Sequence, residues 1–264
     1  MLKHIIAITA VTASLAGARA DDEPKLVEAG KLTWGSSPTF VPFEFMRDGK
    51  PVGFDVDLME ELAKRSGFVS TIMPMEFKGV LPALLGNRID AGVSGLYVTA
   101  ERQQVADFVP YAIVGNQILV LKGNSKKVDG PKTLCGLKVG VPVSTAFEVA
   151  VKKASDECKA AGKSEVEILS LPGSNNVALA LQQGRVDAAV NSTATSAAMM
   201  SESPGTYELG GIPFDANTKV GIALRRDEMA LKAKLETAIQ AMVKDGAYAA
   251  LLKKWNLPEQ SSAY

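Results

Sequence analysis

One pattern of apolar and polar positions occurs twice in this chain. Ahead of Gly86 and again ahead of Gly184, apolar residues recur at helical spacing, and a short continuous apolar run follows each glycine. This pattern predicts a helix and then a buried strand, at residues 89–93 and 186–190. The two glycines are expected to end the helices, because glycine accepts the left-handed conformation found there.

The two copies predict two similar lobes. They begin at residues 84 and 181, a spacing well beyond the ~20–50 residues of solenoid repeats. Coincidence is the alternative, because helix–glycine–strand junctions are common. Ligands of open α/β sheets bind beyond the carboxyl ends of the strands. Ser94-Gly95 and Asn191-Ser192 are therefore expected to face the space between the lobes.

Apolar runs and helical periodicities alternate along the rest of the chain, which predicts α/β architecture. Strands 113–121 and 220–224 are expected to cross between the lobes. Lobe 1 is then built from residues 21–115 and 216–264, and lobe 2 from residues 116–215. The other expected strands are 32–34, 72–75, 137–141 and 166–171, and the other expected helices are 56–66, 145–159, 228–244 and 248–254.

The first twenty residues predict an export signal. Lys3 supplies the charged start, residues 5–16 are apolar, and Ala18-Arg19-Ala20 is a small-x-small cleavage site. The apolar stretch is shorter than the ~20 residues that span a bilayer. A buried helix is the alternative. We expect residues 1–20 to be a signal peptide and the mature chain to be a soluble, secreted protein.

Removal of that signal limits the chemistry of the mature chain. Taking Lys3 and Arg19 from the 29 basic residues leaves 27 against 29 acidic ones, a net charge of −2. Nucleic-acid binding, which calls for a basic patch, is therefore not expected. His4 is the only histidine, so histidine-dependent catalysis and histidine metal sites are excluded. No metal and no cofactor are predicted.

Two cysteines, Cys135 and Cys158, remain in the mature chain. An exported chain favours a disulfide. Cys135 precedes the strand expected at 137–141, and Cys158 lies near the end of the helix that follows. Because a βα unit folds back on itself, the end of the helix returns towards the start of the strand. Two free buried thiols are the alternative.

Arg102 and Thr145 are candidates for anion binding. Thr99 is a good N-cap, so Arg102 lies in a first helical turn, where the macrodipole disfavours a cation by ~0.3–1 kcal/mol. A guanidinium can hold a carboxylate by two parallel hydrogen bonds; pairing with Asp107 or Glu101 is the alternative. Thr145 has a glutamate three residues on, the spacing of a capping box. That helix start offers amides to an anion, or is an ordinary N-cap.

The order of the motifs resembles the family 3 periplasmic solute-binding proteins of polar amino-acid ABC importers. The motifs that carry the resemblance are Phe40-Val-Pro-Phe-Glu-Phe, Gly53-Phe-Asp-Val-Asp-Leu, Thr99-Ala-Glu-Arg102, Pro110-Tyr111, Gly184-Arg-Val-Asp-Ala, Asp245-Gly-Ala-Tyr and Lys254-Trp255. The resemblance implies a two-lobed, type II periplasmic binding protein-like α/β fold with two crossing hinge strands.

The resemblance also implies a function. We expect the chain to be a monomer in the periplasm of a Gram-negative bacterium that delivers a small carboxylate solute to an inner-membrane ABC permease, and not an enzyme. The alternative is a periplasmic enzyme on the same fold, similar to cyclohexadienyl dehydratase. The residues that the resemblance assigns to the ligand are Arg102 for its carboxylate, Ser94, Gly95 and Tyr97 for backbone and hydroxyl contacts, Phe40 and Phe77 as aromatic walls, and Thr145 and Ala146 as helix-start amides.

One position departs from the family pattern. Five residues after Asp187, where the family usually has an acid that pairs with the ligand's ammonium, this chain has Ser192, with Asn191 beside it. A desolvated ammonium without a counter-charge is costly. Either another acid substitutes, with Glu44 and Glu148 as candidates, or the ligand is an N-substituted amino acid, an opine-like compound or a plain carboxylate.

Overall fold

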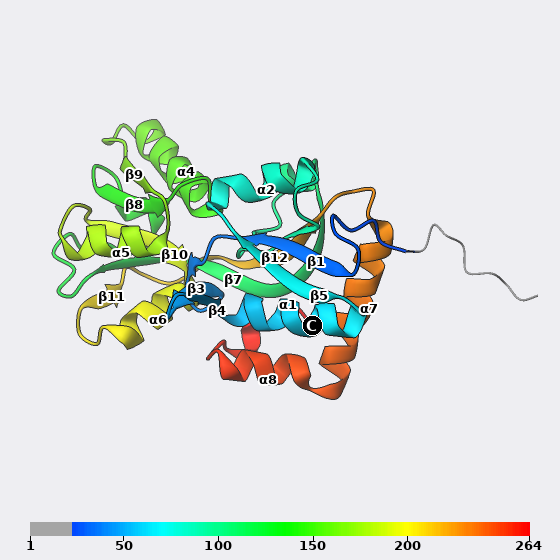
Figure 1. Cartoon of the computed structure of the whole chain (residues 1–264). Coiled ribbons are helices and arrows are strands. Elements are labelled where there is room, and N and C mark those ends of the chain that lie inside the picture. The colour runs from blue at the N-terminus through cyan, green and yellow to red at the C-terminus, as the bar shows by residue number, and fades with distance from the viewer. Residues whose placement is uncertain (1–22) are drawn as a thin grey trace, which may run out of the picture.

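The computed structural model describes residues 23–264 (Figure 1). The predicted signal peptide, residues 1–20, lies outside the described residues. Within the described part of the chain, every helix is too short or too polar to cross a membrane.

One large sheet runs through both lobes in the order β5-β1-β6-β12-β7-β10-β8-β9, and β11 also pairs with β7. Parallel pairs β1–β5 and β1–β6 belong to lobe 1, and parallel pairs β8–β9 and β8–β10 belong to lobe 2. The strands are β1 (Lys31–Ser36), β5 (Val69–Pro74), β6 (Ala91–Gly92), β7 (Asp107–Leu121), β8 (Lys138–Pro142), β9 (Glu167–Leu171), β10 (Ala188–Ser192), β11 (Tyr207–Leu209) and β12 (Phe214–Leu224).

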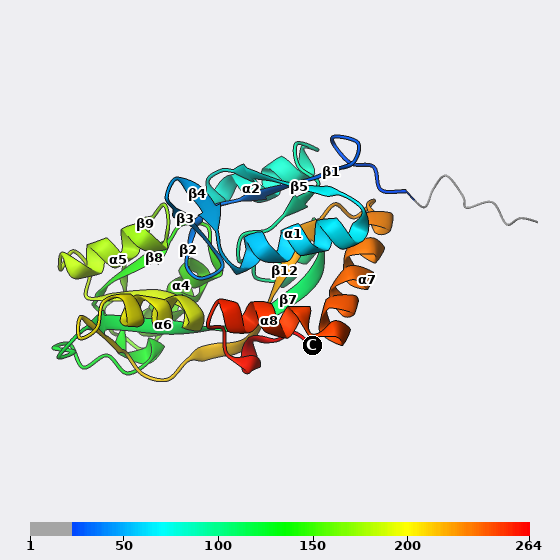
Figure 2. The same ribbon diagram turned by 60° about the horizontal axis from the view of Figure 1, so that its bottom comes forward.

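Strands β7 and β12 join the lobes. They pair antiparallel with each other, and β7 then pairs antiparallel with β10 of lobe 2. Both views show the two strands running side by side between the lobes (Figures 1 and 2). The predicted two-lobed α/β fold with two crossing strands is confirmed. The exact lobe boundaries stay a prediction.

Helices cover the sheet in both lobes (Figure 2). Lobe 1 has α1 (Phe54–Ser66), α2 (Phe77–Leu85), α3 (Ala100–Gln103), α7 (Met229–Asp245) and α8 (Ala247–Lys254). Lobe 2 has α4 (Ala146–Ala160), α5 (Ser174–Gln182) and α6 (Thr193–Glu202). A separate small sheet contains β2 (Thr39–Phe40), β3 (Glu44–Arg47) and β4 (Lys50–Val52).

Helix α6 and the small sheet were not predicted from the sequence. Helix α6 reads Thr-Ala-Thr-Ser-Ala-Ala-Met-Met-Ser-Glu. Its small residues form no clear apolar stripe, so the helical period is weak. The strands of the small sheet are only two to four residues long, too short to show an alternating pattern.

The two copies of the sequence pattern are the units α2–β6 and α5–β10. Gly184 has the expected left-handed conformation, with φ 68°. The same expectation for Gly86 is wrong: its φ is −82°, and Asn87, with φ 54°, is the left-handed residue. Asparagine tolerates this conformation because its short side chain bonds locally.

The repeated aspartates have the same structural role in both lobes. Asp90 accepts hydrogen bonds from the backbone N–H of Val27 at 2.7 Å and of Thr33, in β1, at 2.8 Å. Asp187 accepts one from the N–H of Lys138, in β8, at 2.9 Å. Each aspartate therefore ties its own unit to the first strand of its lobe.

A disulfide joins Cys135 and Cys158, whose Cα atoms are 5.5 Å apart. Cys135 precedes β8 and Cys158 lies near the end of α4, so the βα unit folds back as expected. Two free thiols are excluded as the alternative.

We expect replacement of both cysteines by serine to lower the free energy of unfolding by about 3 kcal/mol, the loop-closure contribution of a loop this long. The bonded residues are 23 apart in sequence. Urea unfolding of the double variant and of the oxidised wild type measures the difference. Equal stabilities, or two free thiols in the unreduced, denatured protein, would contradict this prediction.

Candidate functional site

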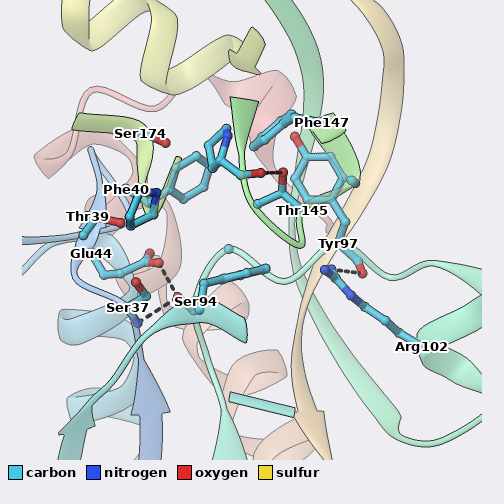
Figure 3. A pocket seen from close by; sticks show the side chains of 16 residues that line it. Ser37, Thr39, Phe40, Glu44, Ser94, Tyr97, Arg102, Thr145, Phe147 and Ser174 are labelled. Carbon is cyan, nitrogen blue, oxygen red and sulfur yellow. Dashed lines mark hydrogen bonds between the residues drawn. The ribbon is translucent and has the colours of Figure 1, made fainter. Parts of the chain in front are cut away.

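A cavity lies between the lobes (Figure 3). The lining residues follow the carboxyl ends of β1, β5 and β6 in lobe 1 and of β8 and β9 in lobe 2, which is where an open α/β sheet binds ligands. They are Ser37, Thr39, Phe40, Glu44, Phe77, Ser94, Gly95, Tyr97, Arg102, Pro142, Thr145, Ala146, Phe147, Pro172, Gly173 and Ser174.

Eight of the ten residues that the sequence predicted as ligand contacts line this cavity. They are Phe40, Phe77, Ser94, Gly95, Tyr97, Arg102, Thr145 and Ala146. The fold brings these residues together from both lobes, and their contact with a ligand stays a prediction.

Asn191 and Ser192 do not line the cavity, which corrects the expectation that they face the space between the lobes. Both are fully buried and pair with β7. Ser192 caps α6: its hydroxyl accepts the N–H of Thr195 at 3.0 Å and donates to the Thr195 hydroxyl at 2.9 Å. Because β10 continues directly into α6, these side chains are used within lobe 2.

Arg102 is a cation in the cavity wall. Its Nη1 donates to the carbonyl of Tyr97 at 3.0 Å, and its Nη2 donates to the carbonyl of Ser144, in lobe 2, at 3.3 Å. The guanidinium also lies over the ring of Phe77, 5.5 Å from its centroid, a cation–π geometry. Burial lowers the pKa of the Arg102 guanidinium, and the charge on Glu101 opposes this.

Neither carboxylate suggested as a surface partner forms an ion pair with Arg102. Asp107 instead pairs with Lys232 at 3.3 Å, and no carboxylate of the described residues lies within ion-pair distance of Arg102. A partly buried arginine whose hydrogen bonds go to two carbonyls can exchange them for an anionic ligand. This arrangement supports the carboxylate-binding interpretation.

The start of α4 is built as the sequence indicated. Thr145 Oγ1 accepts the N–H of Glu148 at 3.3 Å and donates to the carbonyl of Pro142 at 2.6 Å. Glu148 accepts the N–H of Ser144, one residue ahead of the cap, at 2.8 Å. Burial raises the pKa of Glu148, but hydrogen bonds from Ser170 and Ser144 lower it below its ordinary value. Glu148 is thus engaged outside the cavity lining.

Glu44 is a buried carboxyl in the cavity wall, beside Asp55. The Ser94 hydroxyl donates to Glu44 Oε1 at 2.8 Å. Asp55 Oδ2 accepts from the Tyr111 hydroxyl at 2.7 Å and from the N–H of Gly95 at 3.3 Å, so that N–H is already engaged. Glu44 Oε2 and Asp55 Oδ1 are buried and have no permanent donor within the described structure. The two carboxyls hydrogen-bond each other when one of them is protonated.

Simultaneous ionisation of the Glu44 and Asp55 carboxyls is unfavourable. Burial raises the pKa of Glu44 well above its ordinary value, and the neighbouring Asp55 charge raises it further. Burial also raises the pKa of Asp55, from 3.8 to about 6, although the hydrogen bond from Tyr111 opposes this. The pair therefore resists carrying two negative charges.

Aromatic rings connect the two lobes across the cavity. Phe147 of lobe 2 lies 6.2 Å from Phe40 and 5.2 Å from Tyr97, both of lobe 1, between ring centroids. The hydroxyl of Tyr97 is buried without a partner among residues 23–264. Phe147 was not among the residues predicted from the sequence, although its position directly after Thr145-Ala146 indicates a place at the cavity.

Comparison with known proteins gives one consistent result. The family model described as bacterial extracellular solute-binding proteins, family 3, matches residues 32–258. The L-cystine-binding protein TcyJ of Escherichia coli is 31% identical over 88% of this chain and 84% of that protein. The histidine-binding periplasmic protein of Salmonella typhimurium is 32% identical over 85% of this chain and 87% of that protein.

A solved structure agrees. An ancestral arginine-binding protein bound to glutamine has a TM-score of 0.79 and 35% identity, covering 88% of this chain and 100% of that one.

We expect Glu44→Gln to raise the free energy of unfolding at pH 8 by about 1–3 kcal/mol, because a buried acid that resists ionisation is removed. Since the pKa values of Glu44 and Asp55 are raised on folding, the stability due to their protonated forms is present below about pH 4 and lost as pH rises through about 6. The difference between the variant and wild type should therefore shrink towards pH 4.

Glu148→Gln is the matched control for this pH series. The pKa of Glu148 is lowered, so this glutamate contributes stability above its ordinary pKa and loses it in acid. Its substitution should destabilise the protein at pH 8, the opposite sign. Urea unfolding from pH 4 to 8 measures both variants. A Glu44→Gln protein less stable than wild type at pH 8 would contradict the shared-proton interpretation.

Proposed function

The chain belongs to the bacterial extracellular solute-binding proteins of family 3, and from this premise we propose that it binds an amino acid or a similar carboxylate for an inner-membrane ABC permease. The cystine-binding and histidine-binding relatives support an amino-acid ligand. Those relatives are named as binding proteins, so the chain is a binding protein rather than an enzyme. The dehydratase alternative has no support among them.

The observation that carries the proposal is the position of Arg102. It reaches the cavity beside the start of α4, where Thr145 and Ala146 also line the wall. A carboxylate there would take the guanidinium donors that the carbonyls of Tyr97 and Ser144 now hold, together with amides of a helix N-terminus. A bidentate guanidinium–carboxylate pair is among the stronger hydrogen-bonded contacts in proteins.

The crossing strands supply the mechanism of capture. The lobes contact each other around the cavity through Arg102–Ser144 and through the Phe147 ring, while β7 and β12 connect them. Opening about these strands admits the solute, and closure buries it, as in other hinge-closing binding proteins. We further propose that residues 1–20 direct the chain to the periplasm, where it acts as a monomer.

Two classes of ligand fit this proposal, and they differ in whether the ligand carries a primary ammonium group. Ser192 in place of an acid suggested an N-substituted amino acid, an opine-like compound or a plain carboxylate. The cavity wall nevertheless contains one acid, Glu44, which supports an ordinary amino acid instead. We therefore propose an amino acid as the ligand and keep the other carboxylates as the alternative class.

We expect Arg102→Ala to weaken ligand binding by about 2–5 kcal/mol, because the buried carboxylate loses its counter-charge. Folding stability should change little, since Arg102 has no carboxylate partner and its helix start disfavours a cation. A thermal-shift panel of amino acids and carboxylates finds the ligand, because a solute at about 100 times its Kd stabilises the fold by about 2.7 kcal/mol. Calorimetry then measures the loss.

Arg102→Lys is the control, because it keeps the charge but loses the planar fork. It should bind more weakly than wild type and more tightly than Arg102→Ala. If Arg102→Ala binds the solute within threefold of wild type, the carboxylate assignment is wrong. Turnover of prephenate or arogenate by the purified protein would favour the dehydratase alternative.

A further inference from the structure

We propose that Glu44, held in place by Asp55, binds the primary ammonium group of the ligand, and that the solute is a net-neutral, zwitterionic amino acid. This inference rests on the proposed function, in which Arg102 binds the ligand's carboxylate. It adds the residue that replaces the missing acid at position 192, and it specifies the charge class of the solute.

The charges in the cavity wall are one cation and one acid. Of the residues that line it, Arg102 is the basic one and Glu44 the acidic one. Tyr97 remains neutral because burial raises the pKa of its phenol. Asp55 stands behind Glu44 and does not line the cavity. The wall therefore offers one positive and one negative group to whatever enters.

Glu44 is oriented for this role. It is 0% exposed, and the Ser94 hydroxyl donates to its Oε1 while accepting the N–H of Ser37 at 3.0 Å. A carboxylate oxygen accepts more than one hydrogen bond, so Oε1 can also take an ammonium N–H. Figure 3 shows Glu44 beside Ser94, with Arg102 on the other side of the cavity. A ligand between them meets both charges.

Asp55 acts as a positioning residue. Its Oδ2 is fixed by Tyr111 and by the N–H of Gly95, while its Oδ1 faces no permanent donor. In the empty protein the donors Tyr111 and Gly95 favour the negative charge on Asp55. An ammonium group beside Glu44 opposes this preference, because it attracts the negative charge to Glu44 and leaves the proton on Asp55. The pair thus presents one negative charge without requiring both buried carboxyls to ionise.

The single cation and single acid of the cavity wall also limit the charge of the ligand's side chain. The carboxylate of an amino acid uses Arg102 and its ammonium uses Glu44, so a charged side chain would be buried with no partner in the wall. A charge that is buried without a partner of opposite sign strongly weakens binding. Phe40, Tyr97 and Phe147 supply apolar wall for the rest of the ligand. An uncharged side chain fits, whereas those of arginine, lysine, aspartate and glutamate do not.

The experiment compares matched ligands by calorimetry on the full mature chain at pH 7. The probes are neutral L-amino acids (leucine, phenylalanine and glutamine), the N-acetyl and 2-oxo-acid counterparts of the one that binds most tightly, L-arginine and L-glutamate. We expect the N-acetyl and 2-oxo compounds to bind at least 30-fold more weakly than the amino acid. Arginine and glutamate should bind at least tenfold more weakly than the neutral amino acid.

Glu44→Gln tests the assigned residue. Glutamine keeps the shape of the protonated acid, accepting from Ser94 and donating to Asp55, but it carries no charge. We expect at least a 30-fold loss for the amino acid and less than a threefold change for its 2-oxo acid. Asp57→Asn is the control: Asp57 lies on the same helix as Asp55, pairs with Lys254 at 2.7 Å and does not line the cavity. Its affinity for both ligands should stay within threefold of wild type.

Three results would overturn the inference. They are amino-acid binding by Glu44→Gln within threefold of wild type, N-acetyl or 2-oxo compounds that bind as tightly as the amino acid, and arginine or glutamate as the tightest ligand. In each case the loss of binding in Arg102→Ala would still support the proposed function. If instead no amino acid or carboxylate binds the wild type, the proposed function fails together with the inference.

Discussion

The antiparallel pairing of β7 with β12 is the constraint on which the rest of the structure depends. It joins two lobes whose parallel strands, β1 and β6 in one and β8 and β10 in the other, end towards a common space. The loops that follow β1, β6, β8 and β9 therefore meet there and form one cavity. A second pairing, of β7 with β10, places Asn191 and Ser192 beside β7, and Ser192 also caps α6. The end of β10 therefore does not reach the site.

The charged groups at this cavity are buried or partly buried without a partner of opposite charge among the described residues. Arg102 donates to two carbonyls rather than to a carboxylate, and the buried pair Glu44 and Asp55 resists a second negative charge because burial raises the pKa of both. Groups that lower stability in the empty protein and gain partners from a ligand are typical of binding sites. Arg102 and Glu44 together therefore describe the ligand better than either residue alone.

The repeated aspartates show how a sequence repeat can be structural rather than functional. Asp90 and Asp187 accept backbone N–H groups of β1 and β8 and do not line the cavity. The residues that follow the two copies then diverge. Ser94 and Gly95 come after the two-residue strand β6 and open into the cavity, whereas the corresponding residues of lobe 2 continue β10 into a helix.

The sequence by itself determined most of the fold and much of the site. Local periodicity indicated the αβ units, because side-chain spacing alone places apolar residues on one face of a helix or strand. The short-range geometry of a βα unit likewise predicted that Cys135 and Cys158 lie close together. The order of the motifs predicted that Arg102, Thr145 and the aromatic walls line one cleft. Tertiary structure alone decided that Asn191 and Ser192 are buried beside β7 and that Glu44 lines the cavity next to Asp55. These outcomes depend on which distant strands pair and which side chains they bury, and no local pattern encodes that.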